Sequence, residues 1–284
     1  MLRSSNPILS KKDAFTPAAP QYGQAPYGQS NFQPYPAQGY QQPGYPQDPT
    51  GAPARPTGDS GGVMTLDDVV TKTAVTMVVL IATAALAWRF MPPELYFPAM
   101  ILSALVGFVV VLLVSFRRLV SPPLVLVYAA IEGVFIGMIS KVFEGYYPGI
   151  VVQAVVATFF AAGVTLAAYK IFNIRVTPKF QKVVFISTAA FAALMLVNFI
   201  FSLITGGPGI RGGITGPVTL FAVGISAIAI VLAVLNLVLD FDYIEQGVKM
   251  GAPARESWRA AFGLTVTMVW LYIEMLRLLS YLRR

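Results

Sequence analysis

The residues of this sequence that could do chemistry in a membrane are a few carboxylates within long apolar stretches. Glu274 lies in the run WLYIEMLRLL, and Glu132 lies in YAAIEGVFIG. Asp240, Asp242 and Glu245 lie where another apolar run ends, in LVLDFDYIEQG. An ionisable side chain inside a bilayer costs on the order of 2.5 to 3.5 kcal/mol on insertion scales. We therefore interpret these acids as candidate functional groups.

The sequence contains no cysteine and no histidine. This excludes disulfides, thiolate metal sites, cysteine nucleophiles and catalytic zinc held by histidine. Oxygen ligands favour Ca²⁺ or Mg²⁺ over zinc or copper. No nucleophile with an adjacent base can be identified, and Gly–Asp occurs only at Gly58–Asp59, outside the apolar runs. We therefore expect neither an enzyme nor a bound cofactor.

The composition indicates a membrane protein. The chain is 56% hydrophobic and 12% charged, against roughly 25% charged in an ordinary soluble domain. The net charge of +7 does not indicate nucleic-acid binding, because the basic residues lie between apolar runs. A membrane-crossing helix needs about twenty residues, and seven apolar runs are close to this length: 69–88, 95–115, 122–142, 149–169, 183–205, 217–239 and 257–281. We expect an all-α integral membrane protein of seven transmembrane helices.

Two regions divide the chain. Residues 1–62 are rich in Gln, Pro, Tyr and Gly, with near-repeats such as QYGQAPYGQ and GYQQPGYPQ, and have no apolar period. They are expected to be a disordered cytoplasmic tail that acts as a tether, or that docks protein partners through its tyrosines. Residues 63–284 are expected to form the transmembrane domain, which begins with a capping pattern at Thr65 and Asp68.

The distribution of lysine and arginine predicts the orientation in the membrane. With the N-terminus in the cytoplasm, the inner loops hold more basic residues than the outer ones, and the C-terminus lies outside. Arg283 and Arg284 argue mildly against this orientation. The inner residues are Arg117, Arg118, Lys170, Arg175, Lys179, Lys182, Lys249, Arg255 and Arg259, and the outer ones are Arg89, Lys141 and Arg211.

Positions 240 and 242 do not share a helix face, so one aspartate can face the bundle while the other faces water. Two carboxylates that meet in a low dielectric cannot both ionise easily, so a closed bundle would hold one proton and lose it as the pH rises. Arg117 and Arg118 either anchor the second span or latch an aspartate. Glu132, among small neighbours, either packs between helices or lines a pore.

Three segments in order on the seven spans, SPPLVLVYAAIEGVFIG, DFDYIEQG and WLYIEMLRLL, resemble the Bax inhibitor-1 (transmembrane BAX inhibitor motif) family. The resemblance covers about residues 62–284 and is strongest to bacterial, actinobacterial-type members. It implies six helices around a central seventh, a bacterial plasma membrane, and a pH-sensitive calcium leak. The partners that it implies are the lipid bilayer, protons, and Ca²⁺ as the permeant ion.

The same resemblance implies a proton-sharing pair of Asp240 and Glu274, which would also hold Ca²⁺ transiently, and a latch at Arg117 or Arg118. Asp242 is the alternative partner of Glu274. Counted from the turn at 251–254, Asp240 and Glu274 differ in depth by roughly 15 Å, so contact would need helix tilt or an irregular turn.

Two functions remain open from the sequence. One is the pH-sensitive calcium leak. The other is a membrane-anchored scaffold that recruits stress-response partners through the tail. A proton-coupled transporter is less supported, because no inverted repeat or pair of Gly/Pro-broken helices is evident.

Overall fold

The computed structural model describes residues 62–284 except 118–119, 208 and 216. The predicted disordered tail, residues 1–62, lies outside the described residues except for its last residue. The described part is helical and contains seven helices long and apolar enough to cross a membrane, as the sequence predicts. They are α1 (Leu66–Phe90), α2 (Tyr96–Phe116), α3 (Pro122–Tyr146), α4 (Ile150–Ile171), α5 (Pro178–Thr205), α6 (Leu220–Lys249) and α7 (Glu256–Leu282), with a short 3₁₀ helix η1 (Pro93–Leu95) before α2.

Local sequence signals explain where the helices begin. Thr65, Thr177 and Thr219 each precede a helix, and each side chain accepts a hydrogen bond from the backbone N–H three residues on. The end of α6 differs from the prediction, because the helix continues ten residues beyond position 239. Polarity at Asp240 and Asp242 ends the apolar run there. It does not end the backbone hydrogen bonding.

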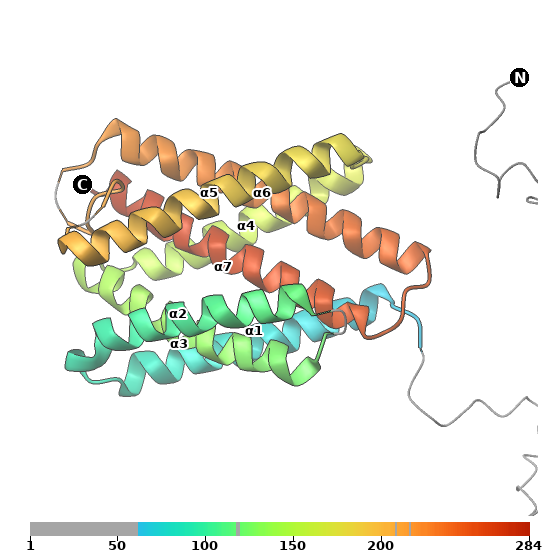
Figure 1. Ribbon diagram of the computed structural model, residues 1–284, viewed down its shortest axis with the longest axis horizontal. Helices are drawn as coiled ribbons and strands as arrows, with labels where there is room; N and C mark the ends of the chain where they lie inside the picture. Colours follow the sequence, from blue (N-terminus) through green and yellow to red (C-terminus); the bar gives the residue numbers. More distant parts are fainter. Residues whose placement is uncertain (1–61, 118–119, 208, 216) are drawn as a thin grey trace, which may run out of the picture. The chain divides into compact units, whose positions relative to one another are not determined.

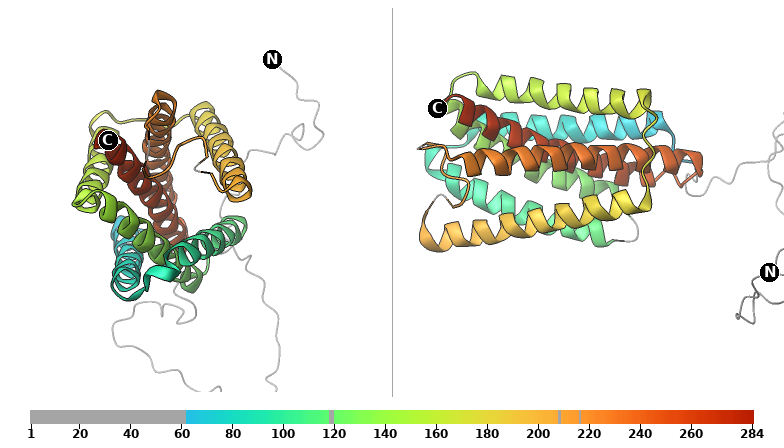
Figure 2. Two further views of the ribbon diagram at one scale, coloured as in Figure 1. Left: turned by 90° about the vertical axis from the view of Figure 1, so that its left-hand side faces the viewer. Right: turned by 90° about the horizontal axis from the view of Figure 1, so that it is seen from above.

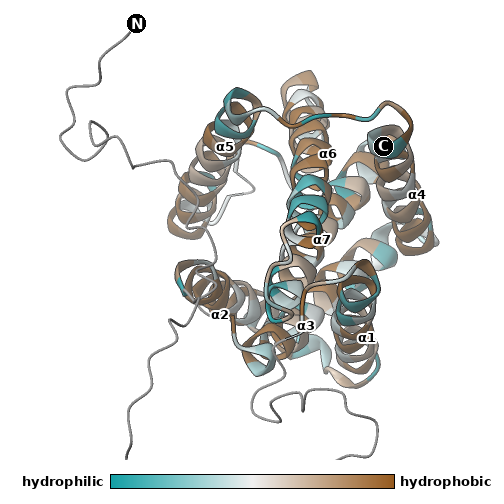
Figure 3. Cartoon of the chain, turned by 90° about the vertical axis from the view of Figure 1, so that its right-hand side faces the viewer, coloured by the Kyte–Doolittle hydropathy of each residue, from teal (hydrophilic) through white to brown (hydrophobic). Residues whose placement is uncertain are grey.

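The helix α7 lies at the centre of the bundle, with the other six around it, as Figures 2 and 3 show. The helices α1, α3, α4 and α6 pack directly against α7. The ring of Phe191 on α5 stacks on that of Trp270 on α7, at 5.8 Å between centroids. On the α2 side, Val110 and Val114 share an apolar cluster with Phe262 of α7. This confirms the architecture that the family resemblance implies.

Glycine allows α1 and α3 to approach closely. A Cβ atom on Gly137 of α3 would lie 2.5 Å from the backbone oxygen of Ala84 on α1, and one on Gly133 would overlap Thr83. Small residues at such positions are typical of helix packing in membranes.

The outward faces of the helices carry many large apolar side chains, and most of the helical ribbon in Figure 3 has the colour of hydrophobic residues. The helix α5 is the extreme case, because Val184 is the one buried residue along its length. Seven apolar helices with this exterior indicate a multi-pass membrane protein.

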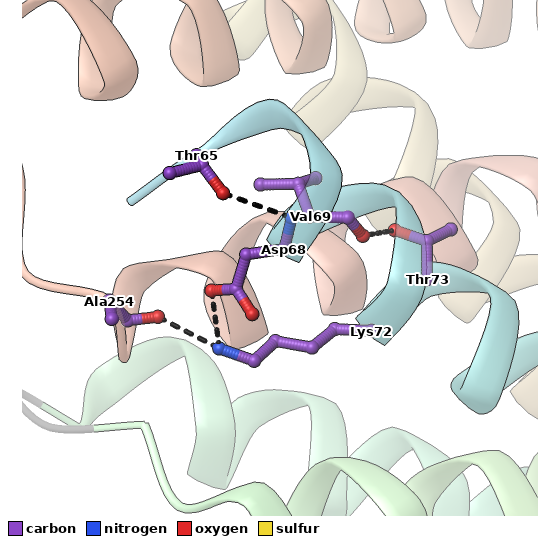
Figure 4. Close-up of polar contacts among 6 residues, drawn as sticks. All are labelled: Thr65, Asp68, Val69, Lys72, Thr73 and Ala254. Atoms are coloured by element: carbon purple, nitrogen blue, oxygen red, sulfur yellow. Dashed lines mark hydrogen bonds and ion pairs between the residues drawn. The ribbon is translucent and has the colours of Figure 1, made fainter. Parts of the chain in front are cut away.

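The bundle has two ends that can be defined by the chain. The N-terminal end is where α1 and α7 begin, and the C-terminal end is where α7 finishes (Figure 1). At the N-terminal end, residues 62–64 pair with the α6–α7 turn: the N–H of Met64 donates to the Ala252 oxygen at 2.7 Å, and that of Ala254 donates to the Gly62 oxygen at 2.7 Å. Lys72 of α1 reinforces this contact through Asp68 at 2.7 Å and the Ala254 carbonyl at 2.9 Å (Figure 4).

Candidate functional site

Asp240 lies on α6 and faces α7. Its Oδ2 atom accepts a hydrogen bond from the Thr267 hydroxyl at 2.7 Å. Gly263, one turn before Thr267, leaves room for the carboxylate, because a Cβ there would lie 3.2 Å from Asp240 Oδ1. Asp240 also borders a cavity of about 300 Å³ lined by Val114, Ser115, Tyr243, Arg259, Ala260, Phe262 and Gly263. The cavity lies toward the N-terminal end of the bundle.

Glu274 lies nearer the C-terminal end and is 2% exposed. Arg211 donates to both of its carboxylate oxygens, with both N···O distances 2.8 Å. The guanidinium carbon of Arg211 lies 5.5 Å from the centre of the Phe191 ring. A bidentate arginine–carboxylate pair is among the stronger polar contacts in proteins, and burial removes the competition of water.

Arg211 reaches Glu274 because the α5–α6 connection folds back over the end of α7. Gly209 and Gly212 have φ angles of 68° and 71°, a left-handed conformation that glycine adopts without strain. The carbonyl of Arg211 accepts a hydrogen bond from the Tyr281 hydroxyl at 2.8 Å. Arg284 donates to the Gly213 carbonyl at 2.8 Å. The connection is therefore fixed over the C-terminal end of the bundle.

The structure does not bring Asp240 and Glu274 together. Thr267, the partner of Asp240, lies seven residues before Glu274 on α7, which corresponds to roughly 10 Å along the helix. Each carboxylate has a different partner, Thr267 for Asp240 and Arg211 for Glu274. The predicted shared proton and joint Ca²⁺ site would need a contact that this conformation does not make.

Asp242 and Glu245 face α4. The hydroxyl of Tyr169 donates to Glu245 at 2.8 Å and to Asp242 at 3.4 Å, and Gln246 donates to Asp242 at 2.5 Å. Asp242 therefore does not replace Asp240 beside α7. Of the two aspartates, Asp240 is the one that faces the central helix.

The geometry at Arg117 differs from that of the predicted latch, in which an arginine pairs with an aspartate. The side chain of Arg117 is exposed, and its backbone carbonyl accepts a bond from Arg259 at 3.4 Å. Arg118 lies outside the described residues. Among the described residues, Arg259 of α7 is the cation that lines the cavity beside Asp240, and it forms an ion pair with Glu256 at 2.7 Å.

Glu132 belongs to α3, and its carboxyl group faces α2. A Cβ atom on Gly107 of α2 would lie 2.9 Å from Glu132 Oε2, so the carboxyl group packs directly against the glycine. This geometry agrees with the helix-packing alternative. Within the described part of the chain, no group of three or more carboxylates is arranged to hold a metal ion.

Comparison with known families agrees with this fold. A family model described as Bax inhibitor 1 like matches residues 6–284. The chain belongs to the Bax inhibitor 1 like family. The match begins within the tail, whereas the motifs in the sequence indicated a resemblance from about residue 62. No curated protein matches the chain.

In this Bax inhibitor 1 like protein the sequence named Asp240 and Glu274 as candidates, but it did not predict Arg211 as the partner of Glu274. The positive-inside rule counts Arg211 as one of three cations in the outer loops. The available signal was its position in the run GGPGIRGG, where glycines permit a connection that turns back into the bundle.

Proposed function

We propose that this protein passes cations, and Ca²⁺ in particular, down their gradient along α7, with the charge of Asp240 controlling the flux. The observation that carries the proposal is the contrast between the two carboxylates along α7. Asp240 borders a cavity whose mixed lining includes Ser115 and Arg259, while Glu274 is sealed by Arg211. This conformation is then the closed state, with the barrier at the Glu274–Arg211 pair.

The surroundings of Asp240 support a change of charge during function. In the described part of the chain, its side chain receives one hydrogen bond, from a neutral hydroxyl. The cavity also contains Arg259 and the hydroxyl groups of Ser115 and Tyr243. An ionised Asp240 attracts a cation into the cavity and competes with Glu256 for Arg259, whereas a protonated Asp240 does neither. Hard cations such as Ca²⁺ are bound by oxygen ligands of this kind.

The test is Ca²⁺ flux into proteoliposomes that contain a calcium dye, measured from about pH 6 to about pH 8. A side chain that controls the flux near neutral pH must change its charge within this range. We expect the wild-type flux to rise with pH, and Asp240→Asn to remove that dependence. Asp242→Asn is the matched control, because Asp242 faces α4. Absence of wild-type flux at every pH, or an equal effect of the two substitutions, contradicts the proposal.

A further inference from the structure

A second, larger cavity lies between α1 and α4. Its volume is about 490 Å³, within the range of roughly 300–1,000 Å³ of small-molecule sites. Both helices line it and make no direct contact with each other in the described part, while α3 and α7 supply the remaining wall. Figure 3 shows α1 and α4 on the same side of α7. The lining is almost entirely apolar, from residues such as Met77, Leu80, Ile136, Val155 and Met268.

The side-chain oxygens in this lining are already paired within the protein. The hydroxyl groups of Ser140 and Tyr272 bond to each other at 2.6 Å, and that of Thr158 donates to the Ala154 carbonyl at 2.7 Å. Glu144 accepts from the N–H groups of Gly149 and Val151. Since each of these oxygens already has a partner, the walls offer few free polar groups to a ligand or a buried water. The chemistry of the cavity therefore fits an apolar ligand.

The cavity is continuous with the lipid-facing surface. The lining residues Ile81, Val152 and Phe159 are 55%, 67% and 54% exposed. They belong to helices that are expected to cross the hydrocarbon core. A hydrocarbon chain can enter between α1 and α4 from the bilayer without crossing a polar barrier.

Cationic residues flank the lining residues at the C-terminal end of the bundle, where the lining itself contributes one carboxylate, Glu144. Arg89, which is exposed, follows the lining residue Trp88. Lys141 donates to the Trp88 carbonyl at 2.6 Å. Arg283 donates to Gln153, next to the lining residue Val152, at 2.7 Å. Their charge complements that of an anionic headgroup.

From these observations we infer that the α1–α4 cavity binds an anionic phospholipid, with one acyl chain inside the cavity and the phosphate beside Arg89 and Lys141. The bound chain contacts Met268, Val269 and Tyr272, which lie on α7 between Thr267 and Glu274. Lipid occupancy thus acts on the segment of the central helix that separates the two carboxylates. Binding itself can be measured without transport, so its failure is distinguishable from that of the proposed leak.

Trp88 provides a local probe of this site. The protein has three tryptophans, and Trp258→Phe with Trp270→Phe leaves Trp88 as the sole indole. The double variant is reconstituted in phosphatidylcholine with increasing fractions of phosphatidylglycerol brominated along its acyl chains. Bromine quenches indole fluorescence on contact. We expect half-maximal quenching at a mole fraction at least about fivefold lower for brominated phosphatidylglycerol than for brominated phosphatidylcholine, because a single cation near an anionic headgroup already provides that preference.

Two neighbouring valines on α4 give the matched control. Val155 lines the cavity, whereas Val156 is 62% exposed and does not. In the Trp88 background, Val155→Phe fills the site and is expected to abolish the preference for brominated phosphatidylglycerol, while Val156→Phe preserves it. Circular dichroism and size-exclusion profiles verify that both variants fold. Equal quenching by the two brominated lipids, or equal behaviour of the two variants, overturns the inference.

Discussion

The two halves of this bundle each place a carboxylate at the central helix, but the surroundings of the two carboxylates are opposite: Asp240 of α6 faces α7 in the N-terminal half, and Glu274 belongs to α7 in the C-terminal half. Glu274 has a cationic partner that donates two hydrogen bonds and is almost fully enclosed. Asp240 has one hydroxyl partner and borders a cavity. The comparison teaches that two acids within membrane spans can have very different surroundings. The partner of each acid sets that difference, and its position in an apolar run does not.

The Glu274–Arg211 pair also shows a cost. The Nε atom of Arg211 is buried and has no hydrogen-bond partner in the described part of the chain. Unpaired buried donors are uncommon in folded proteins and call for a physical reason. If the proposed leak is correct, this end of the bundle opens, and an incompletely satisfied contact is easier to separate.

The largest expected effect comes from breaking that pair. Arg211→Gln leaves Glu274 buried without its cation, which typically costs about 3–5 kcal/mol. We expect a large fall in the midpoint of thermal unfolding in detergent. Arg89→Gln removes an exposed arginine from the same end of the bundle and is the control. Equal midpoints for the two variants would mean that the pair does not hold the connection in place.

A smaller effect is expected at Asp240. Thr267→Val removes the hydroxyl donor with little change of shape, and a buried acceptor that loses its partner costs about 1–3 kcal/mol. Thr265→Val is the matched control two residues away, because Thr265 bonds to the Ala261 carbonyl of its own helix. We expect Thr267→Val alone to change the pH dependence of Ca²⁺ flux. A change of similar size in Thr265→Val would assign the effect to α7 packing.

The smallest effect is expected from the tail. Deletion of residues 1–60 leaves intact the contacts of Gly62 and Met64 with the α6–α7 turn, so we expect unchanged flux and unfolding midpoint. Thr65→Ala is the comparison, since loss of an N-cap costs about 1 kcal/mol. Loss of flux on deletion would favour the alternative that the tail's partners are central to function.

The sequence predicted the seven spans because hydropathy reports the environment of each segment, and length limits how it can cross the bilayer. It also identified Asp240 and Glu274 as unusual, since both lie where a charge is costly. It could not predict their partners. Arg211 lies 63 positions from Glu274 in the chain, and its contact depends on how a glycine-rich connection folds back. In the same way, the rotation of α6 about its axis determines that Asp240 faces α7 and that Asp242 faces α4.

The most direct test of the contrast between the two halves is their accessibility to a charged thiol reagent, which is possible because the chain has no native cysteine. Ser115→Cys places a thiol in the Asp240 cavity, and Ser280→Cys places one in a fully buried position beyond Glu274. In reconstituted protein we expect rapid modification of the first and none of the second, and rapid modification of the second once Arg211→Gln is added. Equal reactivity of the two cysteines in the wild-type background, or an unreactive Ser280→Cys in the Arg211→Gln background, would contradict closure by the Glu274–Arg211 pair.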